Sequence, residues 1–296
     1  TRFGLGCIGS RGMAGALTPE TLAGITDING TNFLEAANAA GYGGPDMATM
    51  LKGTRVAEGQ VSHFVELHIE QGPNLENDGI DIGIVTAIAA PAALRVRFVG
   101  NGGHAGALLM PFRKDAGLAA AELALAVEKA TLRTGAIDTV GTTGLFKIYP
   151  GAVNSVPRDA HLEIDVRDID LERRDQVVQE IREAAEEISQ RRGTTVEIEL
   201  LNADPPATSG ASILEAAEQS VKQMGVSYTK MVSRAYHDSL FMARIAPTAM
   251  IFIPCRGGVS HRPDEYSSPA DMARGVQALA LTMARLAGTP GCHDEL

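Results

Sequence analysis

The chain has 296 residues, of which 26 are basic and 36 acidic, so its net charge is −10. This acidic balance argues against a nucleic-acid partner, because proteins that bind phosphate backbones carry clustered positive charge. No apolar run reaches the roughly 20 residues that a membrane-spanning helix requires, so no membrane insertion is expected. The content of 45% hydrophobic and 21% charged residues is typical of a globular protein.

The first 91 residues combine a glycine- and alanine-rich start with two strand-like segments. Short helices are expected over residues 33–40 and 47–51. Residues 62–69 alternate like a half-buried strand, which Gly72 and Pro73 end. Residues 83–90 are a short continuous apolar run, which indicates a buried strand.

The segment 92–203 has a different pattern of predicted elements. In chain order they are a strand at 94–99, a helix at 115–132, strands at 139–148 and 161–168, a charged amphipathic helix at 171–190 and a strand at 194–201. This order, β-α-β-β-α-β, is that of the split ferredoxin-like unit.

Residues 204–296 return to an α/β pattern after the linker-like segment 204–209. The predicted elements are helices at 212–223, 239–244 and 268–286 and an apolar strand at 248–254. We therefore expect an α/β domain built from residues 1–91 and 204–296, into which the ferredoxin-like unit, residues 92–203, is inserted.

Two histidines follow predicted strands of the first domain. His68 precedes a Gly-Pro loop, and His261 follows strand 248–254 through a glycine pair. Open α/β sheets place ligands at such strand ends. Neutral imidazoles there would suit a divalent metal, although each histidine alone is more often an ordinary hydrogen-bonded residue.

The inserted segment contains three further candidates. His104 lies in a glycine-rich turn, Gly-Asn-Gly-Gly-His-Ala-Gly at 100–106, which allows close approach to a ligand or is simply a flexible hairpin. Asn154 and Arg167 belong to adjacent predicted elements. Arg167 could hold a substrate carboxylate with two hydrogen bonds, or could pair with Asp165 or Asp168.

A polar cluster, Ser-Arg-Ala-Tyr-His-Asp-Ser at 233–239, suggests a Ser-His-Asp hydrolase. We set that interpretation aside, because catalytic triads are assembled in space from separate segments and no Gly-x-Ser-x-Gly turn is present.

Together the motifs are specific. The run Glu-Leu-His-Ile-Glu-Gln-Gly-Pro at 66–73, Gly-His-Ala-Gly at 103–106, Asn154-Ser155, Arg167 and Ser260-His261 make the chain resemble the M20-type dinuclear-metal amidohydrolases. That family includes hydrolases of allantoate, of N-carbamoyl amino acids and of ureidoglycolate. Residues 87–128 and 231–269 look most similar to its plant ureidoglycolate branch.

The resemblance implies a metallopeptidase-like α/β catalytic domain with an inserted ferredoxin-like lid that also forms a homodimer. It implies hydrolysis of a small ureido-carboxylate substrate at a metal pair, with manganese favoured and zinc as the alternative. The implied roles are metal binding for His68 and His261, oxyanion stabilisation for His104, and substrate binding for Gln71, Asn154, Arg167, Tyr236 and His237. An M20 aminopeptidase is a weaker alternative.

The family's other ligands, a His-x-Asp motif and a Glu-Glu pair that supplies the general base, have no counterpart before His68. We therefore expect the chain to be truncated at its N-terminus and not competent for hydrolysis on its own. An alternative is a metal-free protein that retains only the scaffold and dimerisation role of segment 92–203.

The C-terminal sequence His-Asp-Glu-Leu at 293–296 predicts retention in the lumen of the endoplasmic reticulum. In that compartment the sequon at Asn29 could be glycosylated, and Cys7 and Cys255 could form a disulfide. For Cys7, Cys255 and Cys292 the pairing stays open.

Overall fold

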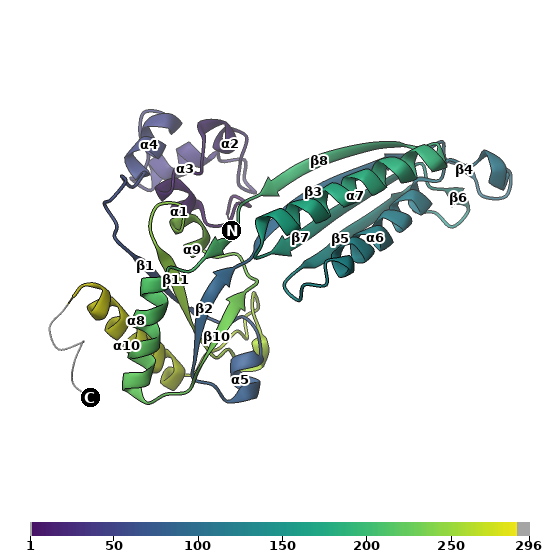
Figure 1. Ribbon diagram of the computed structural model, residues 1–296. Coiled ribbons are helices and arrows are strands. Elements are labelled where there is room, and N and C mark those ends of the chain that lie inside the picture. The colour runs from purple at the N-terminus through teal and green to yellow at the C-terminus, as the bar shows by residue number, and fades with distance from the viewer. Residues whose placement is uncertain (1, 289–296) are drawn as a thin grey trace. The chain divides into compact units, whose positions relative to one another are not determined.

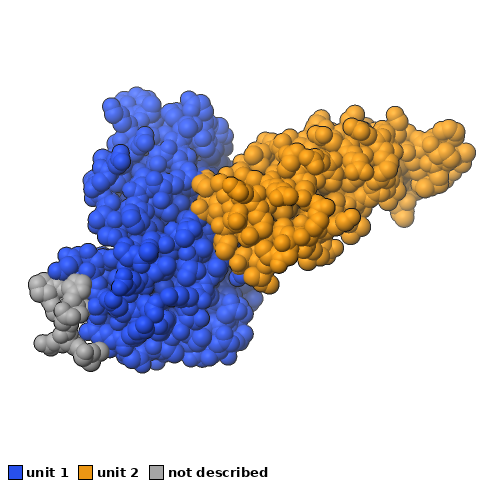
Figure 2. Space-filling view, viewed as in Figure 1, with its two compact units in different colours: residues 1–88, 207–296 blue, residues 89–206 orange. Residues whose placement is uncertain are grey.

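The computed structural model describes residues 2–288, and these form two compact units (Figures 1 and 2). Unit 1 combines the segment up to Ile88 with the segment from Ala207 onward, and unit 2 comprises Ala89–Pro206. Both units mix helices and strands, so the expected α/β class is confirmed. Each helix within residues 2–288 is too short or too polar to act as a transmembrane span.

Unit 1 is built on a sheet with the strand order β1-β11-β2-β10. Its strands are β1 (Phe64–Ile69), β2 (Ile82–Ile88), β10 (Tyr228–Ser233) and β11 (Thr248–Ile253), and the short β9 (Ala207–Thr208) pairs with β2. β1 runs parallel to β11 with His68 beside Phe252. The carboxyl ends of these two strands therefore meet at one edge of the sheet, as the positions of His68 and His261 predicted.

Two helices, α8 (Ala211–Met224) and α10 (Pro269–Leu286), cover one face of this sheet. Side chains alternate along β1, and Val65, Leu67 and Ile69 pack into the core under these helices. Gly275 lets α10 come close, because a Cβ there would lie 2.8 Å from a methyl carbon of Leu67. Residues 66 and 68 consequently point to the opposite face.

On that opposite face, the short helix α9 (Ser239–Met242) contacts β1 and β11. It also contacts α1 (Ile8–Met13), where the Ser10 hydroxyl donates to Asp238 at 2.5 Å. The remaining helices of unit 1 are α2 (Pro19–Ala23), α3 (Phe33–Ala39), α4 (Met47–Thr54) and α5 (Asn74–Asp78). Side chains of Thr18, Asn32 and Asp46 cap the N-termini of α2, α3 and α4.

Unit 2 is a four-stranded antiparallel sheet in the order β5-β7-β3-β8. Its elements are β3 (Ala90–Val99), α6 (Ala116–Arg133), β5 (Val140–Tyr149), β7 (Asp159–Asp168), α7 (Leu171–Arg192) and β8 (Thr195–Ala203). Their order is β-α-β-β-α-β, as predicted. The two helices pack against the sheet and each other around one apolar core (Figure 1). A small separate sheet pairs β4 (Gly103–His104) with β6 (Ser155–Val156).

One buried carboxylate joins β7 to the start of α7. Asp168 is fully buried and accepts hydrogen bonds from the Arg173 guanidinium, the Thr139 hydroxyl and the Asp170 backbone N–H. Asp170 in turn caps the helix, accepting from the Arg173 backbone N–H at 3.0 Å. This network determines where α7 begins.

We expect Asp168→Ala to lower the free energy of unfolding by about 3 kcal/mol, because it leaves Arg173 and Thr139 without their buried acceptor. A urea titration followed by circular dichroism measures the change. Glu163→Ala is the matched control. Glu163 lies on β7 like Asp168 but pairs with Arg95 at the surface, so its loss should barely move the urea midpoint of unfolding. An equal shift for both variants would contradict this account.

The same carboxylate gives a pH prediction. Burial raises the pKa of Asp168, but the hydrogen bonds from Arg173, Thr139 and Asp170 outweigh it, so the net pKa lies below 3.8. A lowered folded-state pKa stabilises the protein above the unfolded pKa, and this contribution disappears as the pH falls through the folded value. The difference between wild type and Asp168→Ala should therefore stay constant above about pH 5 and shrink below about pH 4.

The structure bears on the cysteines and on the glycosylation sequon. Cys7 and Cys255 do not form a disulfide with each other. Asn29 is exposed in a turn, where its backbone N–H donates to Asp27. Cys292 and the His-Asp-Glu-Leu sequence lie outside the described residues.

Candidate functional site

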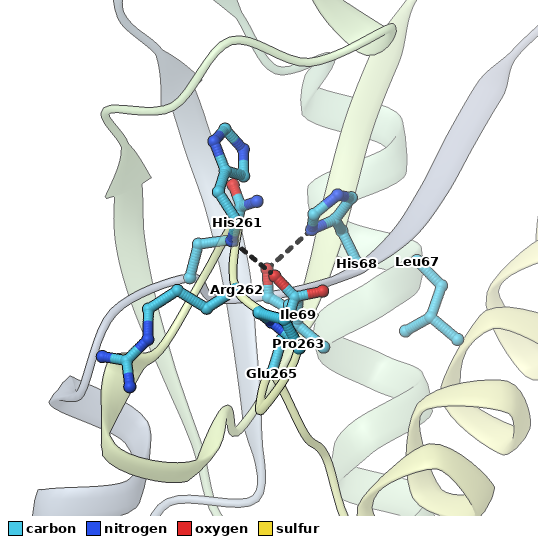
Figure 3. A pocket seen from close by; sticks show the side chains of 8 residues that line it. Leu67, His68, Ile69, His261, Arg262, Pro263 and Glu265 are labelled. Carbon is cyan, nitrogen blue, oxygen red and sulfur yellow. Dashed lines mark hydrogen bonds between the residues drawn. The ribbon is translucent and has the colours of Figure 1, made fainter. Parts of the chain in front are cut away.

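An open pocket of about 730 Å³ lies at the edge of the sheet where β1 and β11 end (Figure 3). Its lining residues are Leu67, His68, Ile69, Gln71, His261, Arg262, Pro263 and Glu265. Three of the residues that the sequence predicted for a site, His68, Gln71 and His261, therefore share one pocket.

His68 is oriented for binding through one nitrogen. Its Nδ1 lies 2.7 Å from the backbone oxygen of Ile69. Because a carbonyl oxygen only accepts, Nδ1 carries a proton, and in the neutral imidazole the lone pair is then on Nε2. Metal-binding histidines usually donate a hydrogen bond from the ring nitrogen that does not bind the metal, and this bond fixes the tautomer.

His68 forms a cluster with Glu66 and His237. One potential ligand atom from each of the three lies within 4.8 Å of the others. The two imidazole rings meet edge to face with centroids 4.7 Å apart. Sequence reasoning missed Glu66, although its position two residues before His68 on the same strand places both on one face. The structure places His237, which the sequence predicted to contact substrate, beside His68.

The surroundings of Glu66 and His237 differ. Glu66 accepts from the backbone N–H and hydroxyl of Ser239 at 2.9 and 2.6 Å, both through Oε2. His237 is only 3% exposed, with Nε2 2.8 Å from the Ser233 hydroxyl. Burial, reinforced by the neighbouring His68, lowers the pKa of His237 to about 3. His237 is therefore neutral near pH 7, the form in which imidazole binds metals.

A side-chain hydrogen bond connects the loops that follow β1 and β11. The Gln71 side chain donates to the Ser260 hydroxyl at 2.8 Å. Gln71 and His261 have positive φ angles of 57° and 58°, a conformation that non-glycine residues adopt at a cost of about 1–3 kcal/mol and that is common at functional sites. Glu70 is buried and accepts from the backbone N–H of Leu75 at 2.8 Å, so it anchors α5.

Tyr236, another predicted substrate contact, lies against the helices of unit 1. Its hydroxyl accepts a hydrogen bond from Arg11, and its ring meets Phe241 edge to face with centroids 5.5 Å apart. The Arg11 guanidinium lies 4.2 Å from the Phe241 ring centroid. These contacts hold Tyr236 in one orientation next to His237.

In unit 2, the small β4–β6 sheet brings His104 and Asn154 close together. Ala105 donates its backbone N–H to the Asn154 backbone oxygen at 2.9 Å. Arg167 lies near the C-terminal end of β7, away from this small sheet, and it makes two hydrogen bonds to Asp165 at 2.7 and 3.1 Å. The alternative in which Arg167 pairs with Asp165 is thus present in the structure.

The model of Peptidase family M20/M25/M40 matches residues 8–285. The chain is 56% identical over 288 residues to a ureidoglycolate hydrolase of Oryza sativa and 54% identical over 289 residues to one of Arabidopsis thaliana. These matches cover 97% of this chain but only 59% and 60% of the two relatives, so the chain spans about three-fifths of their length.

Solved structures give the same result. The crystal structures of AtUAH in complex with glyoxylate and with (S)-hydroxyglycine each match with a TM-score of 0.83 and 53% identity. Each comparison covers 97% of this chain and 68% of the AtUAH chain.

Proposed function

Because this chain belongs to peptidase family M20/M25/M40, we propose that it takes part in metal-dependent hydrolysis of the ureido C–N bond of ureidoglycolate, which releases ammonia, carbon dioxide and glyoxylate. The similarity to two ureidoglycolate hydrolases supports this substrate. Glyoxylate and (S)-hydroxyglycine, the compounds bound in the AtUAH structures, both contain the two-carbon carboxylate part of ureidoglycolate without its ureido group. The observation that carries the proposal is the shared pocket of His68, Gln71 and His261.

The donor set of this pocket fits a divalent metal. His68 has its Nε2 lone pair available, and His261 lines the same opening. Glu66 and His237 offer further ligand atoms beside His68. Mixed imidazole and carboxylate donors suit manganese, our preferred ion, and also zinc. Such an ion would act as a Lewis acid on the ureido carbonyl and promote ionisation of the attacking water.

The chain's own residues would bind and orient the substrate. We assign the substrate carboxylate to Arg167, whose planar guanidinium can make two parallel hydrogen bonds to it. Gln71, Asn154 and Tyr236 supply amide and hydroxyl groups for its polar atoms. His104 would donate from Nε2 to the oxygen that gains charge in the transition state.

A distance within unit 2 supports a homodimer. On β7, Arg167 lies eight positions after Asp159, which corresponds to about 26 Å at the rise of a β-strand. His104 belongs to the β4–β6 sheet and Asn154 directly precedes β6, and this sheet lies beyond the Asp159 end of β7 (Figure 1). One small ureide cannot span that length, so if Arg167 and His104 contact the same molecule, they come from two copies of the chain.

A surface of unit 2 is suited to such a dimer. Leu118, Leu125 and Leu132, spaced by seven residues on α6, are 44%, 67% and 73% exposed. α6 packs on β5, an edge strand that also exposes Phe146 and Ile148. An edge strand has unpaired backbone groups that can pair with another strand. We propose that α6 and β5 contact the same elements of a second copy.

If this surface forms the dimer, the double variant Leu125→Glu, Leu132→Glu should be a monomer, because charges in an apolar interface are unpaired. Light scattering after size-exclusion chromatography measures the mass. Leu201→Glu on β8, the other edge strand, is the matched control and should leave the mass unchanged. A dimer that survives the double variant but not the control would place the interface at β8.

The substrate is tested by measuring ammonia release with added manganese from ureidoglycolate, allantoate and an N-carbamoyl amino acid. The chain is assayed alone and as a chimera that adds the part of the rice relative outside the matched region. We expect turnover of ureidoglycolate in the chimera and none in the chain alone. Preference for allantoate or for an N-carbamoyl amino acid would replace the substrate, and no turnover in either form would refute the proposal.

We also propose that the protein resides in the lumen of the endoplasmic reticulum, on the basis of residues 293–296. Expression of the protein with and without these four residues, behind a signal peptide, tests this. Secretion of only the shortened form would support retention.

A further inference from the structure

The imidazole of His104 is held by its own turn. Its Nδ1 accepts hydrogen bonds from the backbone N–H groups of Gly106 and Ala107 at 3.1 and 3.3 Å. A backbone N–H only donates, so Nδ1 has no proton and Nε2 carries it. The structure thus makes His104 a neutral donor through Nε2, which is the form that can stabilise a developing negative charge.

Little in the local sequence favours this turn. The residues after His104 are Ala105, Gly106 and Ala107, whose small side chains make few contacts. The preceding strand β4 has only two residues. A glycine-rich segment of this kind is conformationally free unless hydrogen bonds hold it. Here the backbone N–H groups of Ala107 and Leu108 also donate to the His104 backbone oxygen at 3.1 and 3.0 Å.

Side-chain support comes from Arg113. Its guanidinium donates through Nε to the Leu108 backbone oxygen at 2.9 Å and through a terminal nitrogen to the Ala105 backbone oxygen. These two carbonyls lie on either side of Gly106 and Ala107, the residues that donate to the His104 imidazole. Arg113 therefore clamps both ends of the turn that determines the tautomer.

The backbone at Arg113 is itself fixed. The Asn101 side chain donates to the Phe112 backbone oxygen at 3.0 Å and accepts from the Lys114 backbone N–H at 3.1 Å. Gly100 lies so close to this segment that a Cβ there would be 1.8 Å from the Lys114 oxygen. The Arg113 side chain thus extends from a backbone segment held in place by Asn101 toward the His104 turn.

We infer that Arg113 is a positioning residue that holds His104 in its Nε2-protonated form. The catalytic consequence rests on the proposed function, but the tautomer does not. The planar guanidinium is needed because it presents its donors in a fixed fork, whereas lysine offers one flexible ammonium. Arg113→Lys should therefore fail to replace it.

The test is nitrogen NMR of histidine-labelled protein, which distinguishes the two neutral tautomers of each imidazole. In the wild type we expect His104 to show the Nε2-protonated pattern alone. In Arg113→Met and Arg113→Lys it should show a mixture of tautomers, with the other histidines unchanged. Lys114→Met removes the neighbouring positive charge without touching the turn and is the matched control. An unchanged His104 pattern in both Arg113 variants would overturn the inference.

Two further readouts separate positioning from general damage. Thermal unfolding of Arg113→Met should stay close to that of the wild type, and a large loss of stability accompanied by changes at every histidine would indicate a merely structural role. In the form of the protein that hydrolyses ureidoglycolate, Arg113→Met should lower kcat about 10- to 100-fold with little change in KM. Small displacements of a catalytic group have effects of this size. Failure of the proposed function would remove this kinetic result but leave the NMR result intact.

Discussion

His68→Ala should abolish tight metal binding in the β1–β11 pocket. The reason is that the hydrogen bond from Nδ1 of His68 to the Ile69 oxygen leaves Nε2 of the neutral ring to bind a metal. Loss of residues that merely orient metal ligands costs about 10- to 100-fold in affinity, so loss of a ligand should cost at least about 100-fold. Manganese content after dialysis and calorimetric titration with manganese measure the change.

His63→Ala is the matched control for this prediction. His63 directly precedes β1, and its Nε2 lies 3.4 Å from the Ser212 hydroxyl. It should bind manganese like the wild type. Equal metal content in all three proteins would show that the pocket is not the metal site.

The same titration decides the role of His237, which the sequence assigned to substrate and the structure places beside His68. If His237 is a ligand, His237→Gln lowers manganese affinity as His68→Ala does. If it contacts substrate, manganese affinity is retained and KM rises. Glu66→Gln is interpreted in the same way, because Glu66 completes the cluster.

The architecture was largely predictable from sequence because its elements are long and regularly patterned. In α7 the apolar residues recur at helical spacing, and the strands β7 and β8 alternate between apolar and polar positions, so their existence and order followed from periodicity. Strand β10 and helix α5 were missed. β10 is irregular, with a register shift between Met231 and Val232, and α5 is a single short turn anchored by the side chain of Glu70.

The site was less predictable, because contacts between distant segments determine it. Strand-end positions correctly placed His68 and His261 at neighbouring strands. The approach of His237 to His68 depends on how α9 packs against β1, which no local pattern records. Likewise, the tautomers of His68 and His104 follow from backbone groups that only the folded chain brings into reach.

His104→Ala should lower kcat about 100- to 1,000-fold with little effect on KM, in whichever form of the protein turns over ureidoglycolate. This is the usual cost of removing one donor that acts only in the transition state. His161→Ala is the matched control, since His161 lies in the same unit and pairs with Asp159. A rise in KM with unchanged kcat would instead make His104 a ground-state binding residue.

Mixing two inactive variants tests whether the site is shared between copies. Arg167→Ala should raise KM, and His104→Ala should lower kcat, so each homodimer is impaired. If Arg167 and His104 of one site come from different copies, a mixed dimer contains one intact site and one site lacking both residues. Random exchange makes half of the dimers mixed, so about a quarter of wild-type activity should return. If both residues of a site belonged to the same copy, mixing would restore nothing, and the distance of about 26 Å along β7 from Asp159 to Arg167 would have to be bridged in another way.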